Sequence, residues 1–345
     1  MVGGVKIGSA YPVSIQSMCN TKTADIPATL AQLQSLASAG AQIGRLAVPD
    51  GESADALSAL VQDSPLPLIA DIHFDYRLAL AAIRAGIAGL RINPGNIGAK
   101  ERIRAVAQAA QAAGIPIRIG VNAGSVRPEQ WAEFDSRSEA MAQLALRQAE
   151  MLEDAGLTAI KISVKSSNIP EMVAAYRRIA GLCDYPLHLG ATEAGTLFRG
   201  SLKNAIGIGT LLLEGIGDTI RVSLTDDPVR EVEVAKEILT MLGLRHSGWQ
   251  FVSCPTCGRT QIDLIALAQR VEDALAAYQP AQPLTVAVMG CVVNGPGEAA
   301  DADLGIAGGQ NGGVIFVHGE KKGFYPEAEL LPRLLAEANK LLDES

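Results

Sequence analysis

The sequence predicts an α/β protein, a (β/α)8 TIM barrel followed by a small α+β domain. The chain has 345 residues, which is long enough for two domains. Residues 1–244 alternate short apolar segments with longer amphipathic ones, as parallel strands and their crossover helices do. The alternation occurs eight times, which favours a closed barrel over an open doubly wound sheet.

Eight apolar segments are predicted as the barrel strands. They span residues 13–18, 43–48, 66–71, 89–93, 115–121, 159–164, 186–191 and 219–224. Amphipathic helices are predicted between them, most clearly at 26–40, 100–114, 138–156 and 227–243. Gly40 is expected to end the first of these helices, and Asp227 followed by Pro228 to begin the last.

The pattern changes after Leu244. Residues 245–253 are predicted as a polar linker and residues 254–345 as the second domain. That domain is expected to hold strands at 284–290 and 313–319, with residues 301–308 between them. A helix is predicted at 260–278, begun by a Thr260-x-x-Asp263 cap, and a last helix at 326–342.

Composition limits the partners and the compartment. The net charge of −8 argues against a general nucleic-acid binder. No apolar run approaches 18 residues and no export signal is visible, so a cytoplasmic protein without a membrane partner is expected. Five cysteines, an odd number, indicate a reducing compartment where thiolates stay available to metals.

Three cysteines and a glutamate form the most informative motif. CPTCGRT (254–260) supplies Cys254 and Cys257, and GCVVNGPGE (290–298) supplies Cys291 and Glu298. A close thiolate pair with a third, distant thiolate suits a tetrahedral metal or an iron–sulfur cluster. Glycines 290, 295 and 297 permit the tight turns that such a site needs.

Other interpretations of these cysteines remain open at this point. The Cys-x2-Cys pair could be a redox dithiol or half of a zinc ribbon, but no second Cys-x2-Cys pair follows. An incompletely thiolate-ligated iron–sulfur cluster is therefore favoured over zinc. Cys19 and Cys183 stand alone and are expected to be core residues.

Polar side chains lie at the ends of the predicted strands, where (β/α)8 barrels carry their chemistry. Arg or Lys occurs in five of the eight strands, although parallel strands are usually apolar. An acidic protein that gathers cations in one mouth is suited to binding a polyanion, and the helix start after VKSS (164–167) adds phosphate-binding amides. The strand-end residues are Gln16, Arg45, Asp71, His73, Arg91, Asn93, Arg118, Asn122, Lys161, Ser163, Lys165, Glu193, Arg221 and Ser223.

These motifs together resemble the bacterial 4-hydroxy-3-methylbut-2-enyl diphosphate synthase family. The resemblance covers essentially the whole chain and the short two-domain form of the family. Its residues are PVSIQSMCNTKT (12–23), ADIHFDYRLAL (70–80), LRINPGNIG (90–98), KISVKSS (161–167), GATEAG (190–195), EGIGDTIRVSLT (214–225), CPTCGR (254–259) and GCVVNGPGE (290–298).

The resemblance implies a cofactor, a substrate and an assembly. It implies a 4Fe-4S cluster held by Cys254, Cys257, Cys291 and Glu298, so that the small domain is an iron–sulfur domain. The implied substrate is 2-C-methyl-D-erythritol 2,4-cyclodiphosphate, opened and dehydrated to the linear allylic diphosphate. Ferredoxin or flavodoxin is the implied electron donor. A homodimer is implied, with the active site shared between subunits.

Roles follow for the strand-end residues. Glu193 is expected to donate a proton to the oxygen lost as water, and Glu298 to be displaced by substrate. Asp71 is expected to orient arginines, whereas His73 is equally suited to a structural or an acidic role. The residues predicted to bind substrate are Arg45, Asp71, Arg91, Asn93, Arg118, Asn122, Lys165, Arg221 and Ser223.

Two other classes of protein are each compatible with part of this pattern. A pterin-binding barrel also carries Asp, Asn, Lys and Arg at its strand ends, but it has no need of the Cys and Glu motif. An iron–sulfur electron carrier would use the barrel only as a scaffold, and a scaffold needs no cations at five strand ends.

Overall fold

The computed structural model describes residues 1–245, 248–278, 280–291, 293 and 295–343. The chain forms two compact units, Met1–Ile238 and Leu239–Ser345, and the boundary between them falls near the end of helix α10 (Pro228–Met241).

The first unit is a barrel of eight parallel strands. Each strand pairs with its neighbours in chain order, and β8 pairs with both β1 and β7. A parallel bridge between Ile162 and Leu187 closes the ring between β6 and β7. The predicted (β/α)8 barrel is therefore confirmed. The strands are β1 (Ser14–Met18), β2 (Ile43–Ala47), β3 (Leu68–Ile72), β4 (Gly89–Ile92), β5 (Ile117–Asn122), β6 (Ile160–Lys165), β7 (His188–Leu189) and β8 (Thr219–Ile220).

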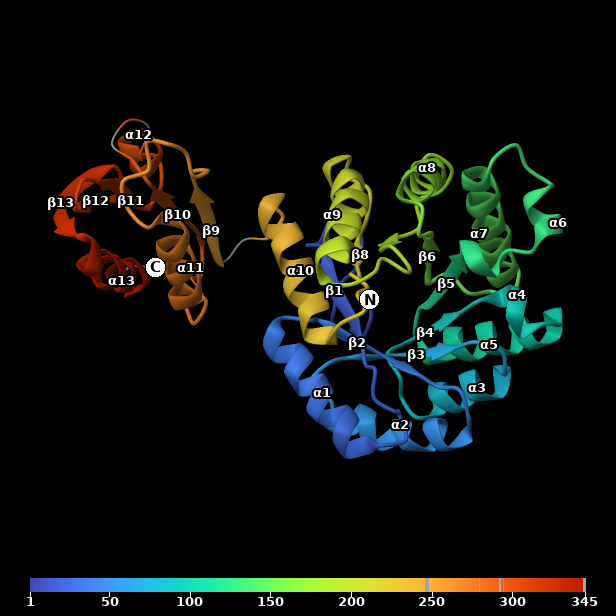
Figure 1. Ribbon diagram of the computed structural model, residues 1–345. Helices are drawn as coiled ribbons and strands as arrows, with labels where there is room; N and C mark the ends of the chain where they lie inside the picture. Colours follow the sequence, from blue (N-terminus) through green and yellow to red (C-terminus); the bar gives the residue numbers. More distant parts are fainter. Residues whose placement is uncertain (246–247, 279, 292, 294, 344–345) are drawn as a thin grey trace. The chain divides into compact units, whose positions relative to one another are not determined.

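Helices surround this barrel (Figure 1). The short helices α4 and α6 and the 3-10 turn η1 (Ala123–Ser125) lie in loops that follow strands β4 and β5. The helices are α1 (Ile26–Ala39), α2 (Gly51–Asp63), α3 (Tyr76–Arg84), α4 (Pro94–Ile97), α5 (Lys100–Ala113), α6 (Pro128–Trp131), α7 (Arg137–Glu153), α8 (Ile169–Ala180), α9 (Leu197–Leu213) and α10 (Pro228–Met241).

Local sequence signals set the ends of these helices. In α1 the Asp25 carboxylate accepts a hydrogen bond from the Ala28 amide, and Gly40 ends the helix at a φ of 108°. Asp227 accepts from the Val229 amide at 2.8 Å and so fixes the start of α10 at Pro228. Both predicted helix boundaries are confirmed.

The second unit contains a five-stranded mixed sheet in the order β13-β12-β11-β10-β9. Helices α11 and α13 share one core cluster with the sheet, and α12 contributes Ala299 to a second cluster. The elements are β9 (Gly248–Ser253), β10 (Pro283–Met289), β11 (Leu304–Gly309), β12 (Gly312–Val317), β13 (Glu320–Pro326), α11 (Leu264–Leu275), α12 (Gly295–Ala300) and α13 (Glu327–Asp343).

Two expectations for the second unit need correction. The segment 245–253, expected to be a linker, contains β9, because Trp249 packs into the core and residues 248–253 pair with β10. The expected helix start at Thr260 is wrong. Helix α11 begins at Leu264, capped by Asp263, while the Thr260 hydroxyl accepts from the Cys257 amide.

Within the described residues, no helix is both long enough and apolar enough to cross a bilayer.

Candidate active site

The C-terminal ends of the barrel strands enclose a cavity of about 240 Å³. Most of the residues predicted to bind substrate line it, and Met18, His73 and Thr192 line it as well. The predicted residues in the lining are Arg45, Asp71, Arg91, Arg118, Asn122, Lys165, Arg221 and Ser223.

Asn93 is the member of the predicted set that does not line this cavity. It follows β4 directly, but its side chain accepts a hydrogen bond from the Gly95 amide at 3.1 Å and caps α4. Although Asn93 is close to Arg91 in sequence, it therefore has a different role, which is to fix the loop after β4.

Strand alternation explains why the cations converge. Residues two apart on a strand face the same side, so Lys161, Ser163 and Lys165 of β6 share a face. Arg118 and Asn122 share the corresponding face of β5, and both line the cavity with Lys165.

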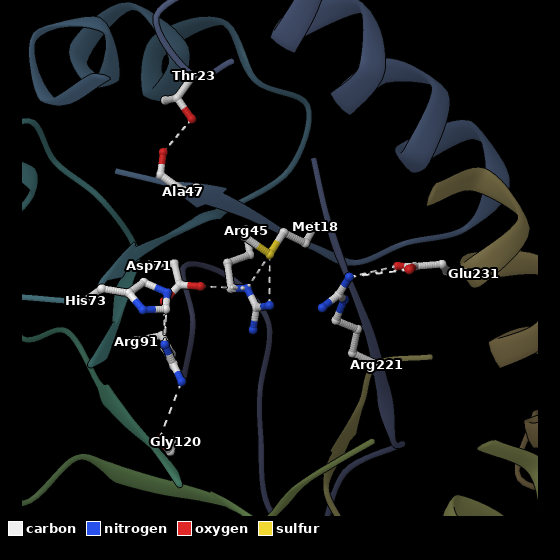
Figure 2. Close-up of polar contacts among 10 residues, drawn as sticks. All are labelled: Met18, Thr23, Arg45, Ala47, Asp71, His73, Arg91, Gly120, Arg221 and Glu231. Carbon is white, nitrogen blue, oxygen red and sulfur yellow. Dashed lines mark hydrogen bonds and ion pairs between the residues drawn. The ribbon is translucent and has the colours of Figure 1, made fainter. Parts of the chain in front are cut away.

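Asp71 is the centre of one group of contacts. Its carboxylate lies 3.1 Å from Arg91 Nη1 and 3.6 Å from Arg45 Nε, and His73 Nε2 lies 3.7 Å away (Figure 2). Burial alone would raise the pKa of Asp71, but Arg45, His73 and Arg91 outweigh it and hold that pKa well below its ordinary value. Asp71 is therefore ionised and holds two arginines at the mouth.

Arg45 is held from a second side by sulfur. Its Nε and Nη2 lie 3.1 and 2.8 Å from Met18 Sδ (Figure 2). A thioether is a weak acceptor, so it orients the guanidinium without neutralising its charge.

Arg221 has a different carboxylate partner, Glu231 of α10. Nη2 of Arg221 lies 3.3 and 3.2 Å from the two Glu231 oxygens (Figure 2). Sequence reasoning missed Glu231, because an acidic residue in the first turn of a helix is commonplace and gives no sign of burial.

Arg118 and Lys165 differ from the three paired arginines. Both are buried, and within the described part of the chain neither forms a salt bridge with a carboxylate. Burial, reinforced by neighbouring arginines, lowers the pKa of each well below its ordinary value. These two cations are the ones that an incoming anion would neutralise.

Two glycines make room for the cations. A Cβ on Gly120 would lie 2.7 Å from Arg91 Nε, and a Cβ on Gly190 would lie 2.3 Å from the Arg221 carbonyl oxygen and 3.0 Å from Lys165 Nζ. A larger residue at either position would displace a cation from the mouth.

Glu193 lies in a neighbouring cavity of about 250 Å³. That cavity shares Asn122 and Thr192 with the cation-lined one, so the two are contiguous. Glu193 is exposed and has a φ of 52°, a left-handed conformation that is costly for a residue other than glycine. Such strain is frequent where a side chain must point in one direction for function.

The cysteine motif lies at one end of the second sheet. Cys254 follows β9 and Cys291 follows β10, and these strands are parallel neighbours. The Gly290 amide donates to Cys254 Sγ at 3.3 Å, and the Gln261 amide donates to the Gly290 carbonyl at 2.9 Å. The two cysteine loops therefore pack against each other.

The chemistry of the donor set is compatible with an iron–sulfur cluster. A hydrogen bond from the Arg259 amide lowers the pKa of Cys257, which favours the thiolate. Glu298 is exposed, in the first turn of α12. Across the described residues, no three His, Cys, Asp or Glu side chains are already gathered to hold a metal ion. The fit rests on three thiolates presented from adjoining loops.

Comparison with known proteins covers both units. Residues 1–236 match the GcpE TIM-barrel domain, and residues 250–340 match the GcpE protein C-terminal domain. A Geobacter sulfurreducens protein named 4-hydroxy-3-methylbut-2-en-1-yl diphosphate synthase (flavodoxin) is 54% identical over 344 residues, 99% of this chain and 97% of its own length. A Lawsonia intracellularis protein of the same name is 52% identical over 345 residues, 99% of this chain and 96% of its own length.

Among solved structures, the barrel resembles Yersinia pestis dihydropteroate synthase. The TM-score is 0.53 at 14% identity, covering 70% of this chain and 96% of that one. At this identity the likeness supports the barrel fold alone, and it gives no support to the pterin-binding alternative.

Proposed function

Because the chain belongs to the GcpE family, we propose that it opens and dehydrates 2-C-methyl-D-erythritol 2,4-cyclodiphosphate. The product is (E)-4-hydroxy-3-methylbut-2-enyl diphosphate. Counting both compounds in their fully protonated forms, two electrons and two protons enter. A C–O bond to phosphate breaks, and one oxygen leaves as water. The observation that carries this proposal is the buried cation cluster at the mouth of an acidic barrel.

The cluster is suited to a diphosphate. Five cationic side chains line the cavity: Arg45, Arg91, Arg118, Lys165 and Arg221. Only two carboxylates, those of Asp71 and Glu231, form salt bridges with them among the described residues. The excess of positive charge stabilises the negative charge that develops on the diphosphate as the ring opens. Asn122 and Ser223 add neutral hydrogen-bonding groups to the same wall.

Glu193 is proposed as the proton donor. It lies beside Asn122 and Thr192 in the adjoining cavity, within reach of a substrate that extends from the cations. A carboxylic acid there can protonate the hydroxyl that leaves as water.

A 4Fe-4S cluster is proposed as the cofactor, held by Cys254, Cys257, Cys291 and Glu298. When bound, it would supply low-potential electrons and a Lewis acid for the leaving oxygen. The chain contributes the thiolates, the Gly290 amide that donates to Cys254, and a carboxylate that a substrate oxygen can replace. Flavodoxin is the proposed electron donor, since the named relatives use it.

A cytoplasmic homodimer is proposed, in which the second unit of each subunit completes the barrel of its partner. The exposed face of α9 supports a second copy as partner: four large apolar side chains recur along it at helical spacing. They are Phe198, Leu202, Ile206 and Leu213.

The function is tested by anaerobic turnover of the cyclic diphosphate with reduced flavodoxin. Mass spectrometry is expected to find the linear allylic diphosphate and one flavodoxin-derived electron pair consumed per product. Electron consumption without this product would refute the proposal.

A further inference from the structure

We propose that Glu231 is a positioning residue that keeps Arg221 turned into the cation-lined cavity. This inference rests on the proposed function, because it takes the cyclic diphosphate as the ligand. Glu231 itself does not line the cavity, so its effect on the ligand passes through Arg221.

The Glu231 carboxylate is buried and makes three contacts. Both oxygens lie within 3.3 Å of Arg221 Nη2, and Oε1 also accepts from the Leu224 amide at 2.9 Å. The side chain is 5% exposed. One carboxylate therefore fixes the guanidinium and the backbone that follows β8, which also carries Ser223.

Arg221 needs such a partner because its other neighbours repel it. Arg221, Lys165 and Arg45 line the same cavity, where burial and then the charge of Arg221 lower the pKa of the other two. Within the described residues, Glu231 is the carboxylate that forms a salt bridge with Arg221. Arg221 Nε is buried without a hydrogen-bond partner in that part of the chain, so the contacts with Glu231 hold the guanidinium through Nη2.

Helix α10 is a firm base for this carboxylate. Asp227 and Pro228 fix its start, and Val232 and Ala235 are each 1% exposed. Glu231 lies in the first turn, where the helix dipole favours a negative charge. The carboxylate is thus held by the helix and by its own contacts before the ligand arrives, which spares the ligand the cost of ordering Arg221.

The direction in which Glu231→Gln changes the diphosphate affinity distinguishes a positioning role from a purely electrostatic one. Glu231→Gln removes a negative charge beside the cations, so a purely electrostatic role predicts tighter binding of a diphosphate. A positioning role predicts weaker binding, because Arg221 is then free to move away from Lys165 and Arg45. We expect the Kd of the cyclic diphosphate, measured by calorimetry, to rise at least about tenfold.

The matched control is Glu233→Gln, two residues along α10, where the carboxylate pairs with the exposed Arg230. Its Kd is expected to stay within about twofold of wild type. Arg221→Ala gives the second test. In that background, adding Glu231→Gln should change the Kd less than about twofold, because the residue through which it acts is gone.

Unchanged or tighter binding by Glu231→Gln overturns the inference, and so does full additivity with Arg221→Ala. If Glu231→Gln fails to fold, Glu231→Asp replaces it. Aspartate keeps the charge but draws the oxygens back from Arg221, so a smaller rise in Kd is expected, and an unchanged Kd counts against positioning. Wild-type protein that binds no cyclic diphosphate would refute the proposed function itself.

Discussion

Individual residues divide the work at the barrel mouth. Asp71 holds Arg45 and Arg91, and Glu231 holds Arg221, so these three guanidinium groups are fixed in place. Arg118 and Lys165 form no salt bridge with a carboxylate among the described residues, so an incoming anion would raise both lowered pKa values and favour the charged forms. A site with some cations oriented and others uncompensated can stabilise anionic charge without rearranging during the reaction.

The uncompensated cations should dominate affinity. Arg118→Ala or Lys165→Ala is expected to weaken binding of the cyclic diphosphate by about 2 to 4 kcal/mol, the range for removing one side of a desolvated charge pair. Titration calorimetry measures the loss, with Arg230→Ala on the surface of α10 as the control. Unchanged affinity in both variants would move the phosphate site elsewhere.

Gly120 should matter through Arg91. In Gly120→Ala the new Cβ would lie 2.7 Å from Arg91 Nε, so the guanidinium must leave its present position between Asp71 and Gly120. We expect affinity for the cyclic diphosphate to fall by about 1 to 2 kcal/mol. Gly51→Ala, where no atom lies within 4 Å of the added Cβ, is the matched control and should bind normally.

The burial of Lys161 predicts that the free energy of unfolding depends on pH. It is buried, and burial lowers its pKa to about 7, below its value in the unfolded chain. Between these two pKa values the unfolded state binds more protons, so the penalty for burying Lys161 is present at and below neutral pH and disappears as pH rises.

Lys161→Met should therefore stabilise the protein at pH 7, by about 2 to 4 kcal/mol in urea unfolding. The gain should shrink as pH rises above 7 and should vanish only above the ordinary lysine pKa, where the wild-type amine is neutral in both states. A gain that is constant across this pH range would show that Lys161 is not the titrating group.

At the scale of elements, sequence periodicity was sufficient for the barrel and less so for the second unit. Apolar runs marked all eight barrel strands because each is buried on both faces. β9 was not predicted as a strand because three of its six residues, 251–253, are exposed, and the polar sequence around Trp249 resembles a connector. β13 was not predicted for the same reason, since its charged residues 320–322 are exposed.

The functional residues, like the strands, could be predicted only where the local sequence pattern is distinctive. Arg45, Arg118 and Lys165 could be predicted because a cation inside an apolar strand is conspicuous. Glu231, Met18 and Gly120 could not, because their roles depend on contacts between elements distant in sequence. The family resemblance, drawn from motifs, is confirmed by the matches over both units.

The two cysteine loops carry the next prediction. Anaerobically isolated protein should be brown with about four irons per chain, and Cys254→Ala, Cys257→Ala or Cys291→Ala should lose the colour. Cys183→Ala is the control, because that cysteine stands in the first unit, after α8. Stoichiometric zinc without iron, by metal analysis of anaerobic material, would refute the proposed cofactor. Glu298→Ala should retain most of the iron and lose activity.

At the scale of the whole molecule, chain connectivity bears on the proposal that a site is shared between two subunits. Barrel helices run antiparallel to the strands, so α10 ends on the side of the barrel opposite the mouth. The next strand, β9, begins at Gly248. The seven steps along the chain from Met241 to Gly248 span at most about 25 Å when extended, whereas a barrel is roughly 40 Å across. We therefore expect each barrel to be completed by the second unit of another chain.

Complementation tests this expectation. Cys291→Ala and Glu193→Gln are each expected to be inactive as homodimers, one lacking a cluster ligand and the other the proton donor. In a mixed dimer that shares sites between subunits, one site combines an intact barrel with an intact second unit, so part of the activity should return. Mass spectrometry establishes that mixed dimers form, and turnover is measured on the same sample. If mixed dimers form but remain inactive, each chain must complete its own site, because no arrangement within one chain can combine the two unaltered parts.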